Sequence, residues 1–399
     1  MYKFISVLFL FPLFFLGCDA PISNNGFKIT KQWQVVKGKD ARAILTGERL
    51  HGRPSVTENG IITYIEGLTD YDKRPIMLNK TTGEMVWRGD DRSIIEAFYL
   101  NIQKDNVLVI NGSDAMVGLD IRSGKTLWRN DAESFGYGIW LNSIGDYYFT
   151  TKLYGQMERK VIRGRISDGF EEVLYTVPPV NEKLEPVILP SPIPYRAANG
   201  DTMLVIQYKE YDDAAYQSKQ YVALYNVSQK RQESFHLVEE RNDGAQWGYG
   251  EYHDGYLITY CHREVVSIDP RSGVYKWRFQ IPGGVSYEPF TTHENKLIVT
   301  SDDGYIYAID MDSGKALWTI GFRGGMAKPF VMDGVVYVTG RAQGHLYAVD
   351  LETGKKLLDL RCPETDQDDA VAFTMPVTGA NGVIYIDSNR STYAYKVER

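Results

Sequence analysis

Residues 305–318 read YIYAIDMDSGKALW, and this stretch decides the fold. The alternating run at residues 305–309 predicts a β-strand, because successive side chains of a strand point to opposite faces. The string DMDSG at residues 310–314 predicts a tight turn, since Asp and Ser side chains bond turn amides and Gly314 accepts a positive φ. Trp318 follows four residues after that glycine. The stretch therefore predicts two antiparallel strands joined by a turn, with a tryptophan on the second strand.

The same pattern recurs along the chain. LDIRSGKTLW, IDPRSGVYKW and LNKTTGEMVW end in tryptophan, VDLETGKKLL ends at Leu358, and RISDGFEEV and NVSQKRQES are degenerate copies. Successive turns are 40 to 45 residues apart, except for one interval of 61 residues. The equivalent turn glycines are Gly83, Gly124, Gly273, Gly314 and Gly354. A period of this length predicts a repeat architecture rather than a set of independent domains.

Each repeat has room for four strands. The strand–turn–strand unit is preceded by two further strands, as in EPFTTHENKLIVTSDDG at residues 288–304. Four antiparallel strands at this spacing predict a propeller blade in an all-β fold. The last repeat, NRSTYAYKVER, lacks its outer strand, and residues 31–36 supply a strand at the other end of the chain. The sequence thus predicts an eight-bladed β-propeller over residues 31–399, closed by an N-terminal strand that removes the open seam.

The tryptophans of the repeat are candidate structural docking residues. Each lies on an outer strand, where its ring can lie flat against the neighbouring blade and become buried. The docking residues predicted in this way are Trp33, Trp87, Trp128, Trp277 and Trp318.

The N-terminal residues predict export and an anchor. Residues 1–17, MYKFISVLFLFPLFFLG, hold an apolar run of about 14 residues, which is short for a membrane span and typical of a signal peptide. Cys18 follows in the string FLGC, which resembles the bacterial lipobox except for Phe15. The resemblance implies lipidation of Cys18, with residues 18–30 as a tether; a chance cysteine after an ordinary signal peptide is the alternative. Asp19 resembles an inner-membrane retention signal of enterobacteria, which other phyla read differently, so inner versus outer membrane stays open.

Composition excludes several classes of protein. The chain has 399 residues and a net charge of −7, so it lacks the basic balance of a non-specific nucleic-acid binder. Three cysteines without a CxxC pair predict neither a disulfide scaffold nor a zinc site. Cys261 and Cys362 fall in blades that are not neighbours, so we expect two unpaired thiols. No motif places a catalytic residue, a metal ligand or a cofactor-binding residue.

The repeat D-x-x-[ST]-G-x-x-x-W resembles the tryptophan-docking repeat of PQQ-type, quinoprotein-like propellers, most strongly over residues 245–360. A lipid-anchored eight-bladed member of this size is similar to the BamB family of outer-membrane assembly lipoproteins. That resemblance implies a non-enzymatic binding scaffold of the bacterial cell envelope, which docks protein partners through propeller loops. The PQQ-dependent alcohol dehydrogenases also share the repeat, but hold their quinone against a disulfide of two adjacent cysteines. A dehydrogenase-like enzyme and a polysaccharide- or small-ligand-binding propeller are the alternatives.

Three loops are candidates for partner docking. Residues 177–196 and 208–220 together explain the 61-residue interval, and PETDQDD at residues 363–369 joins the last two blades. We expect all three on the face that carries the blade-to-blade connections, where binding residues of rigid scaffolds concentrate. Solvated loops are the alternative. The glycine–aromatic strings at residues 135–138 and 247–250 either line the channel mouth or pack within the inner strands.

Overall fold

The computed structural model describes residues 22–24, 26–36, 54–66, 73–90, 101–111, 115–131, 141–152, 160–176, 185–188, 192–212, 217–242, 247–261, 263–322, 327–340, 344–366, 371–373, 375–388 and 390–399. Cys18, the predicted signal peptide and the string at residues 135–138 lie outside these residues.

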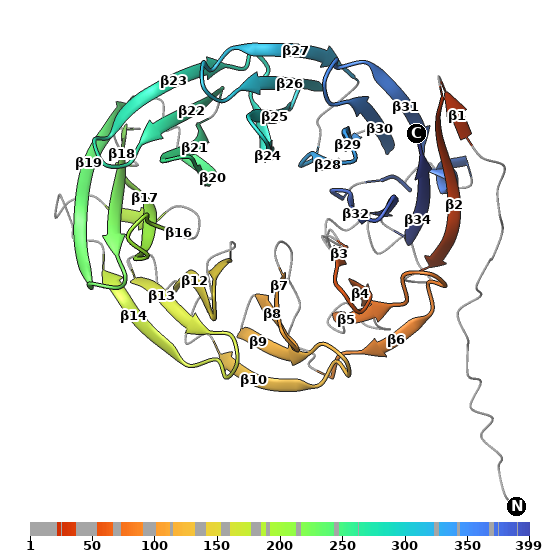
Figure 1. The fold of residues 1–399 in the computed structure, drawn as a ribbon, viewed down its shortest axis with the longest axis horizontal. Coiled ribbons are helices and arrows are strands. Elements are labelled where there is room, and N and C mark those ends of the chain that lie inside the picture. Colours follow the sequence, from red (N-terminus) through yellow and green to blue (C-terminus); the bar gives the residue numbers. More distant parts are fainter. Residues whose placement is uncertain are drawn as a thin grey trace, which may run out of the picture.

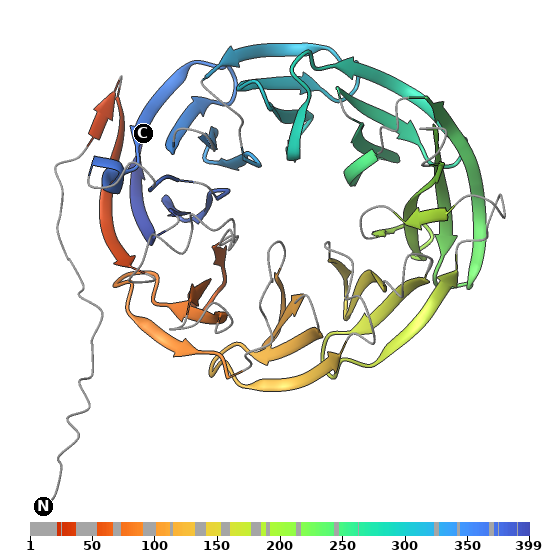
Figure 2. The same ribbon diagram turned by 180° about the vertical axis from the view of Figure 1, so that it is seen from behind.

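Eight β-sheets stand around a ring, each running from an inner to an outer strand (Figures 1 and 2). Neighbouring strands within each sheet pair antiparallel and mostly follow one another in sequence. The predicted all-β, eight-bladed propeller is therefore confirmed.

Six blades are four-stranded. They are blade 1 (β3 Ser55–Val56, β4 Ile61–Glu66, β5 Lys73–Leu78, β6 Met85–Arg88), blade 2 (β7 Asn101–Lys104, β8 Val107–Asn111, β9 Ala115–Asp120, β10 Thr126–Asp131), blade 3 (β11 Asn142–Ile144, β12 Tyr147–Lys152, β13 Lys160–Arg165, β14 Glu171–Thr176), blade 5 (β20 Trp247–His253, β21 Tyr256–Cys261, β22 Glu264–Asp269, β23 Val274–Gln280), blade 6 (β24 Val285–His293, β25 Lys296–Ser301, β26 Tyr305–Asp310, β27 Ala316–Gly321) and blade 7 (β28 Phe330–Met332, β29 Val335–Gly340, β30 His345–Asp350, β31 Lys356–Arg361).

The two middle strands of a blade pack against both neighbouring blades. All six residues of β29 are buried, which explains why such strands read as continuous apolar runs. The outer strands are half exposed; in β23 only Trp277 is buried. The turn after β26 forms as predicted: Asp310 Oδ1 accepts a hydrogen bond from the Ser313 amide at 2.8 Å, and Gly314 has φ +67°.

Tryptophan docking between blades is confirmed. Each indole Nε1 donates a hydrogen bond to a turn carbonyl of the next blade, and each ring lies over the turn glycine there. The pairs are Trp33–Lys80, Trp87–Ile121, Trp128–Ile166, Trp277–Met311 and Trp318–Leu351, at 2.7 to 2.9 Å.

The eighth blade joins the two ends of the chain. Its order is β1 (Ile22–Asn24), β2 (Phe27–Val36), β34 (Ser391–Glu398), β33 (Val383–Asp387) and β32 (Thr378–Ala380). The predicted closing strand is β2, but it begins at Phe27, and β1 adds a fifth strand outside it. Residues 22–30, assigned to the tether from sequence, therefore contribute two strands to the propeller.

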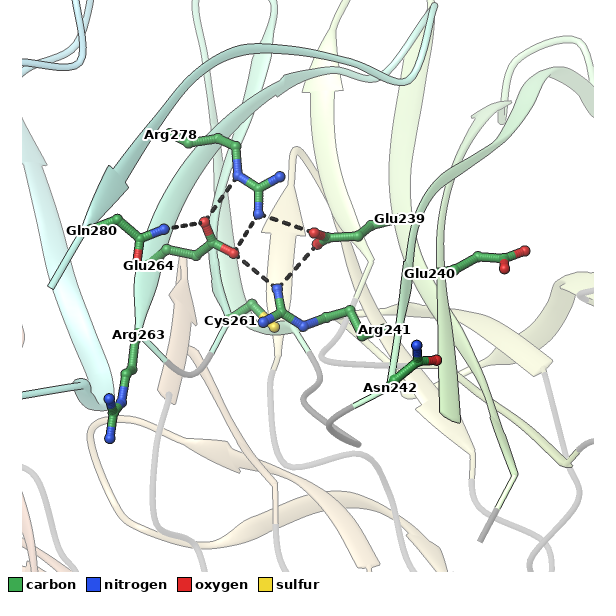
Figure 3. Close-up of a pocket in the computed structure, with 9 residues that line it drawn as sticks. All are labelled: Glu239, Glu240, Arg241, Asn242, Cys261, Arg263, Glu264, Arg278 and Gln280. Atoms are coloured by element: carbon green, nitrogen blue, oxygen red, sulfur yellow. Dashed lines mark hydrogen bonds and ion pairs between the residues drawn. The ribbon is translucent and has the colours of Figure 1, made fainter. Parts of the chain in front are cut away.

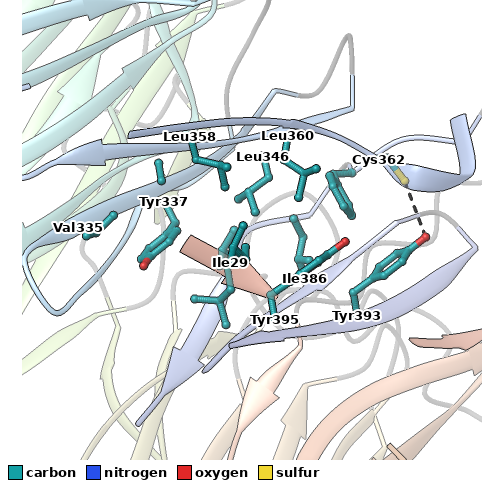
Figure 4. Close-up of a cluster of buried hydrophobic side chains, with 14 of the residues drawn as sticks. Ile29, Val335, Tyr337, Leu346, Leu358, Leu360, Cys362, Ile386, Tyr393 and Tyr395 are labelled. Atoms are coloured by element: carbon teal, nitrogen blue, oxygen red, sulfur yellow. Dashed lines mark hydrogen bonds between the residues drawn. The ribbon is translucent and has the colours of Figure 1, made fainter. Parts of the chain in front are cut away.

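The hairpin of β1 and β2 also explains why blade 7 lacks a docking tryptophan. Leu358 stands where the other blades carry tryptophan, and it packs in one buried cluster with Phe27 and Ile29 (Figure 4). Cys362 and Tyr393 belong to the same cluster, with the sulfur 3.9 Å from the phenol oxygen.

Candidate functional site

Blade 4 differs from the others in length. Its strands are β15 (Glu185–Ile188), β16 (Ile193–Arg196), β17 (Thr202–Asp212), β18 (Gln217–Asn226) and β19 (Arg231–Arg241). β17, β18 and β19 have 11, 10 and 11 residues, whereas β21, β22 and β23 of blade 5 have 6, 6 and 7. β15 pairs with the far end of β17, opposite residues 208–211. The extra length lies at the end of the blade where β19 leads into the connection to blade 5.

The described parts of the two segments predicted as docking loops in blade 4 are therefore mostly strands. Within residues 208–220, Tyr208, Glu210, Ser218 and Gln220 are buried. Tyr208 and Tyr221 donate hydrogen bonds to the Glu210 carboxylate at 3.1 and 3.0 Å. These contacts correct the interpretation of the segment as a loop, because a buried carboxylate and paired strands make it a rigid extension of the blade.

A polar pocket of about 670 Å³ lies between this extension and blade 5 (Figure 3). The C-terminal end of β19 supplies one side of the pocket. The turn after β21, the start of β22 and the end of β23 supply the other side. The residues that line it are Glu239, Glu240, Arg241, Asn242, Cys261, Arg263, Glu264, Arg278 and Gln280.

Glu264 is the centre of an ion network in the pocket. Its side chain is only 4% exposed, and it accepts hydrogen bonds from Arg278 at 2.6 and 2.9 Å and from Arg241 at 2.9 Å. Burial opposes the charged carboxylate, but the hydrogen bonds and charges of the two arginines outweigh it and hold the pKa of Glu264 below its ordinary value. The network therefore ties blade 4 to blade 5 with a carboxylate that stays ionised.

Glu239 completes the network from the blade 4 side. Its carboxylate accepts hydrogen bonds from Arg278 at 3.0 Å, from Arg241 at 3.3 Å and from the Tyr275 hydroxyl at 3.0 Å. The hydrogen bond to Glu264 raises the pKa of Arg278, with a further contribution from Glu239. Two arginines and two glutamates thus neutralise one another and fix the pocket floor.

At this blade boundary Ser234, four residues after the turn, stands in the docking position, and its hydroxyl donates a hydrogen bond to the Pro270 carbonyl at 2.9 Å. His236, two residues further along β19, also lies against the turn of blade 5. Its Nε2 donates a hydrogen bond to the Arg271 carbonyl at 2.6 Å, and its ring lies beside Gly273. Sequence reasoning missed His236; its repeat, NVSQKRQES, lacks the turn glycine, where Lys230 has φ +52°. Counting four residues from the degenerate turn gives Ser234, so the repeat pattern carries no signal for His236.

The third predicted docking loop forms part of the ring closure instead. Residues 363–366 form the 3-10 helix η2 (Pro363–Asp366), and residues 367–369 lie outside the described part of the chain. Glu364 is buried and accepts hydrogen bonds from Gln34, Ser388, Ser391 and Tyr393, at 2.6 to 3.1 Å. The Glu364 carboxylate therefore fastens blade 8 from within the fold.

The structure also places the other residues that the sequence singled out, which are the glycine–aromatic string at residues 247–250 and the two cysteines. Gly248 and Gly250 pack against Tyr260 and Gln207, so this glycine–aromatic string serves inner-strand packing. Cys261 ends β21 and Cys362 follows β31; both are buried and neither forms a disulfide, as predicted.

Among the described residues no group of three His, Cys, Asp or Glu side chains could hold a metal ion. No helix in that same part of the chain is long and apolar enough to cross a membrane.

The fold and its tryptophan-docked turns define a PQQ-like β-propeller. The profile of the family described as outer membrane protein assembly factor BamB matches residues 33–145 and 262–394, more than half of the chain. The chain belongs to this family. No curated protein sequence matches it.

Solved structures share the fold. BamB from Moraxella catarrhalis is 14% identical and aligns over 92% of this chain and 97% of that chain, with a TM-score of 0.59. A europium-containing methanol dehydrogenase is 12% identical over 92% and 93% of the two chains, with a TM-score of 0.60. Quinohemoprotein alcohol dehydrogenase from Comamonas testosteroni is 9% identical over 92% and 76%, with a TM-score of 0.61. At these identities the likeness concerns the fold alone.

Proposed function

We propose that this protein is a non-enzymatic, lipid-anchored scaffold of the bacterial cell envelope, which docks protein partners of the outer-membrane assembly machinery. Membership of the BamB family supports a role in that assembly. The observation that carries the proposal is the extended blade 4, which stands beside a wide polar pocket on the connection face of the propeller.

The extension suits a docking surface because it is rigid before a partner arrives. Its strands pair along their full length, with Asp212 opposite Gln217 and Lys209 opposite Gln220. Glu210 is held by two tyrosines, and the ion network around Glu264 fixes the adjoining pocket floor. A preformed surface loses little conformational freedom on binding, which favours affinity.

The anchor fits this arrangement. In the sequence three residues separate Cys18 from Ile22, where β1 begins, and the four residue-to-residue steps between them reach at most about 14 Å when extended. Acyl chains on Cys18 would hold the rim at blade 8 close to the membrane. Blade 4 lies on the opposite side of the ring from blade 8 (Figure 1), so its extension would stay accessible to envelope partners.

The cysteines support a non-enzymatic role. The dehydrogenases of this fold that the sequence resembles use two adjacent cysteines beside the quinone. Cys261 lies in blade 5 and Cys362 follows blade 7, and both thiols are buried. Burial raises the pKa of the Cys362 thiol, which makes it a poor nucleophile.

A pull-down from gently solubilised membranes, with the lipidated protein as bait, tests the proposal. Deleting residues 208–220 would remove buried strand residues, so a charge reversal is the better variant. Glu240→Lys changes an exposed residue of the extension that pairs with Lys219 at 3.0 Å. Glu352→Lys is the matched control, since Glu352 is exposed and pairs with Lys296 at 3.0 Å in a turn at the other end of a blade.

We expect the wild type to recover an outer-membrane assembly protein, Glu240→Lys to recover a different amount because it reverses a charge on the extension, and Glu352→Lys to recover as much as the wild type. Equal recovery by both variants would place docking elsewhere on the ring. Recovery of no partner by the wild type would overturn the scaffold function, and binding of quinones and sugars would then be measured.

A further inference from the structure

The charges that line the pocket between blades 4 and 5 are not all neutralised. Glu239, Glu264, Arg241 and Arg278 bond one another, Gln280 donates to Glu264 at 3.0 Å, and Glu240 pairs with Lys219 outside the pocket. Arg263 is exposed in the turn between β21 and β22, and its guanidinium makes no hydrogen bond or ion pair with any residue that the structure describes. One fixed cation therefore stands at the mouth of the pocket without a counter-charge.

Asn242 is a second unpaired polar group. It follows β19 directly, its side chain is exposed, and within the described part of the chain its amide makes no hydrogen bond. Figure 3 shows Arg263 and Asn242 on opposite sides of the ion network, with Glu240 on the same side as Asn242. Arg263 and Asn242 thus offer a cation at one end of the pocket and a neutral amide at the other, while Glu240 is paired with Lys219.

We infer that this pocket binds an extended, acidic segment of the partner polypeptide, with a carboxylate on Arg263 and a backbone peptide group on Asn242. The inference rests on the proposed scaffold function and names the chemistry of its partner. A guanidinium matches a carboxylate through two parallel N–H···O bonds, and a primary amide matches the donor and acceptor of a peptide group.

The two ends of the pocket also select the direction and the kind of ligand. The acidic side chain of the segment is directed to Arg263, the charged group of the pocket that has no partner among the described residues, and the peptide group to Asn242. A free phosphate ion would engage Arg263 but leave Asn242 without a partner. The pocket volume of about 670 Å³ falls in the range of sites that hold a whole ligand rather than a single ion.

The test uses the full-length protein and two fluorescein-labelled peptides. In one peptide Glu alternates with Val, and in the other Gln replaces every Glu; inorganic phosphate serves as a competitor. We expect the Glu peptide to bind more tightly than the Gln peptide, more weakly at higher salt, and with little competition from phosphate. Arg263→Ala should weaken binding about tenfold, the usual effect of losing a charge-assisted hydrogen bond, and Arg263→Lys should weaken it less.

Arg271→Ala is the matched control, because Arg271 is exposed at the opposite end of the same blade. It should leave peptide binding unchanged. Equal binding of the two peptides, or equal losses in Arg263→Ala and Arg271→Ala, overturns the inference even where the wild type still recovers a membrane partner. If no partner is recovered, the scaffold function is overturned instead. The peptide titration alone then shows whether the pocket binds an acidic segment.

Discussion

Trp318 of blade 6 donates its indole N–H to the carbonyl oxygen of Leu351 in blade 7 across 2.9 Å. Four more tryptophans make the same bond to the next blade, so five of the eight boundaries carry it. At two further boundaries Ser234, whose hydroxyl donates to the Pro270 carbonyl, and Leu358 stand in the equivalent position. The ring is therefore held by a repeated contact between an outer strand and the turn of the following blade.

The docking tryptophans differ in burial. We therefore expect their replacement by alanine to lower the free energy of unfolding by unequal amounts. Trp33 is 2% exposed, whereas Trp318 is only partly buried. Trp33→Ala should lower the free energy of unfolding by about 3–5 kcal/mol, because a fully buried ring leaves a cavity. Trp318→Ala should cost less. Urea denaturation of the two variants measures both values, and equal costs would contradict the role assigned to burial.

The turn glycines support these rings, as Gly354 illustrates. Gly354 has φ +69°, and a Cβ there would lie 2.8 Å from the Trp318 ring. Gly200 has φ +87° with no atom within 4 Å of the same position. Gly200→Ala should therefore cost only the backbone strain, roughly 1–2 kcal/mol, and Gly354→Ala should cost more. Thermal melting compares them, and a Gly354→Ala variant no less stable than Gly200→Ala would refute the clash.

Glu364 should stabilise the closed eighth blade of the ring. Glu364→Ala removes the acceptor of four donors, Gln34 and Tyr393 among them, and leaves buried polar groups unpaired. We expect a loss of several kcal/mol, because each orphaned donor costs about 1–3 kcal/mol. Glu364→Gln keeps a carbonyl acceptor and should lose less. Hydrogen exchange at β2 and β34 measures the effect, and unchanged protection in Glu364→Ala would count against this role.

The predicted anchor has a direct test at Cys18. Cys18→Ala prevents acylation of that sulfur, so the variant should move from the membrane fraction to the soluble fraction when cells are fractionated. Acyl chains on the wild type should appear as added mass on the N-terminal peptide. Membrane association of Cys18→Ala at the wild-type level would exclude this anchor.

The fold was predictable because its signals are local. Gly314 and Trp318 are four residues apart, and the turn and docking strand recur in one short string. His236 escaped prediction because it lies two residues beyond the docking position of its repeat, and only the bond to Arg271 reveals it.

The candidate site was only partly predictable, because it depends on distant residues. Sequence placed an insertion at residues 208–220 but not its pairing with β15, which is non-local. Glu364 looked solvated in an acidic string, yet donors from both ends of the chain enclose it. Glu264 joins Arg241 across two blades, and no spacing in the sequence encodes that contact.

The last prediction concerns acid stability and Glu264. Its pKa in the folded protein lies below the ordinary value of 4.5, because the two arginine partners outweigh the cost of burial. A depressed carboxylate pKa stabilises the folded state fully above 4.5, and this contribution falls as pH drops from 4.5 through the folded pKa. Glu264→Gln has no such carboxylate. The wild type should therefore exceed Glu264→Gln in stability at neutral pH, and the difference should shrink as the solution is acidified below 4.5. Urea denaturation of both proteins across this range measures it, and a difference that stays constant with pH would show that the arginines do not stabilise the Glu264 charge.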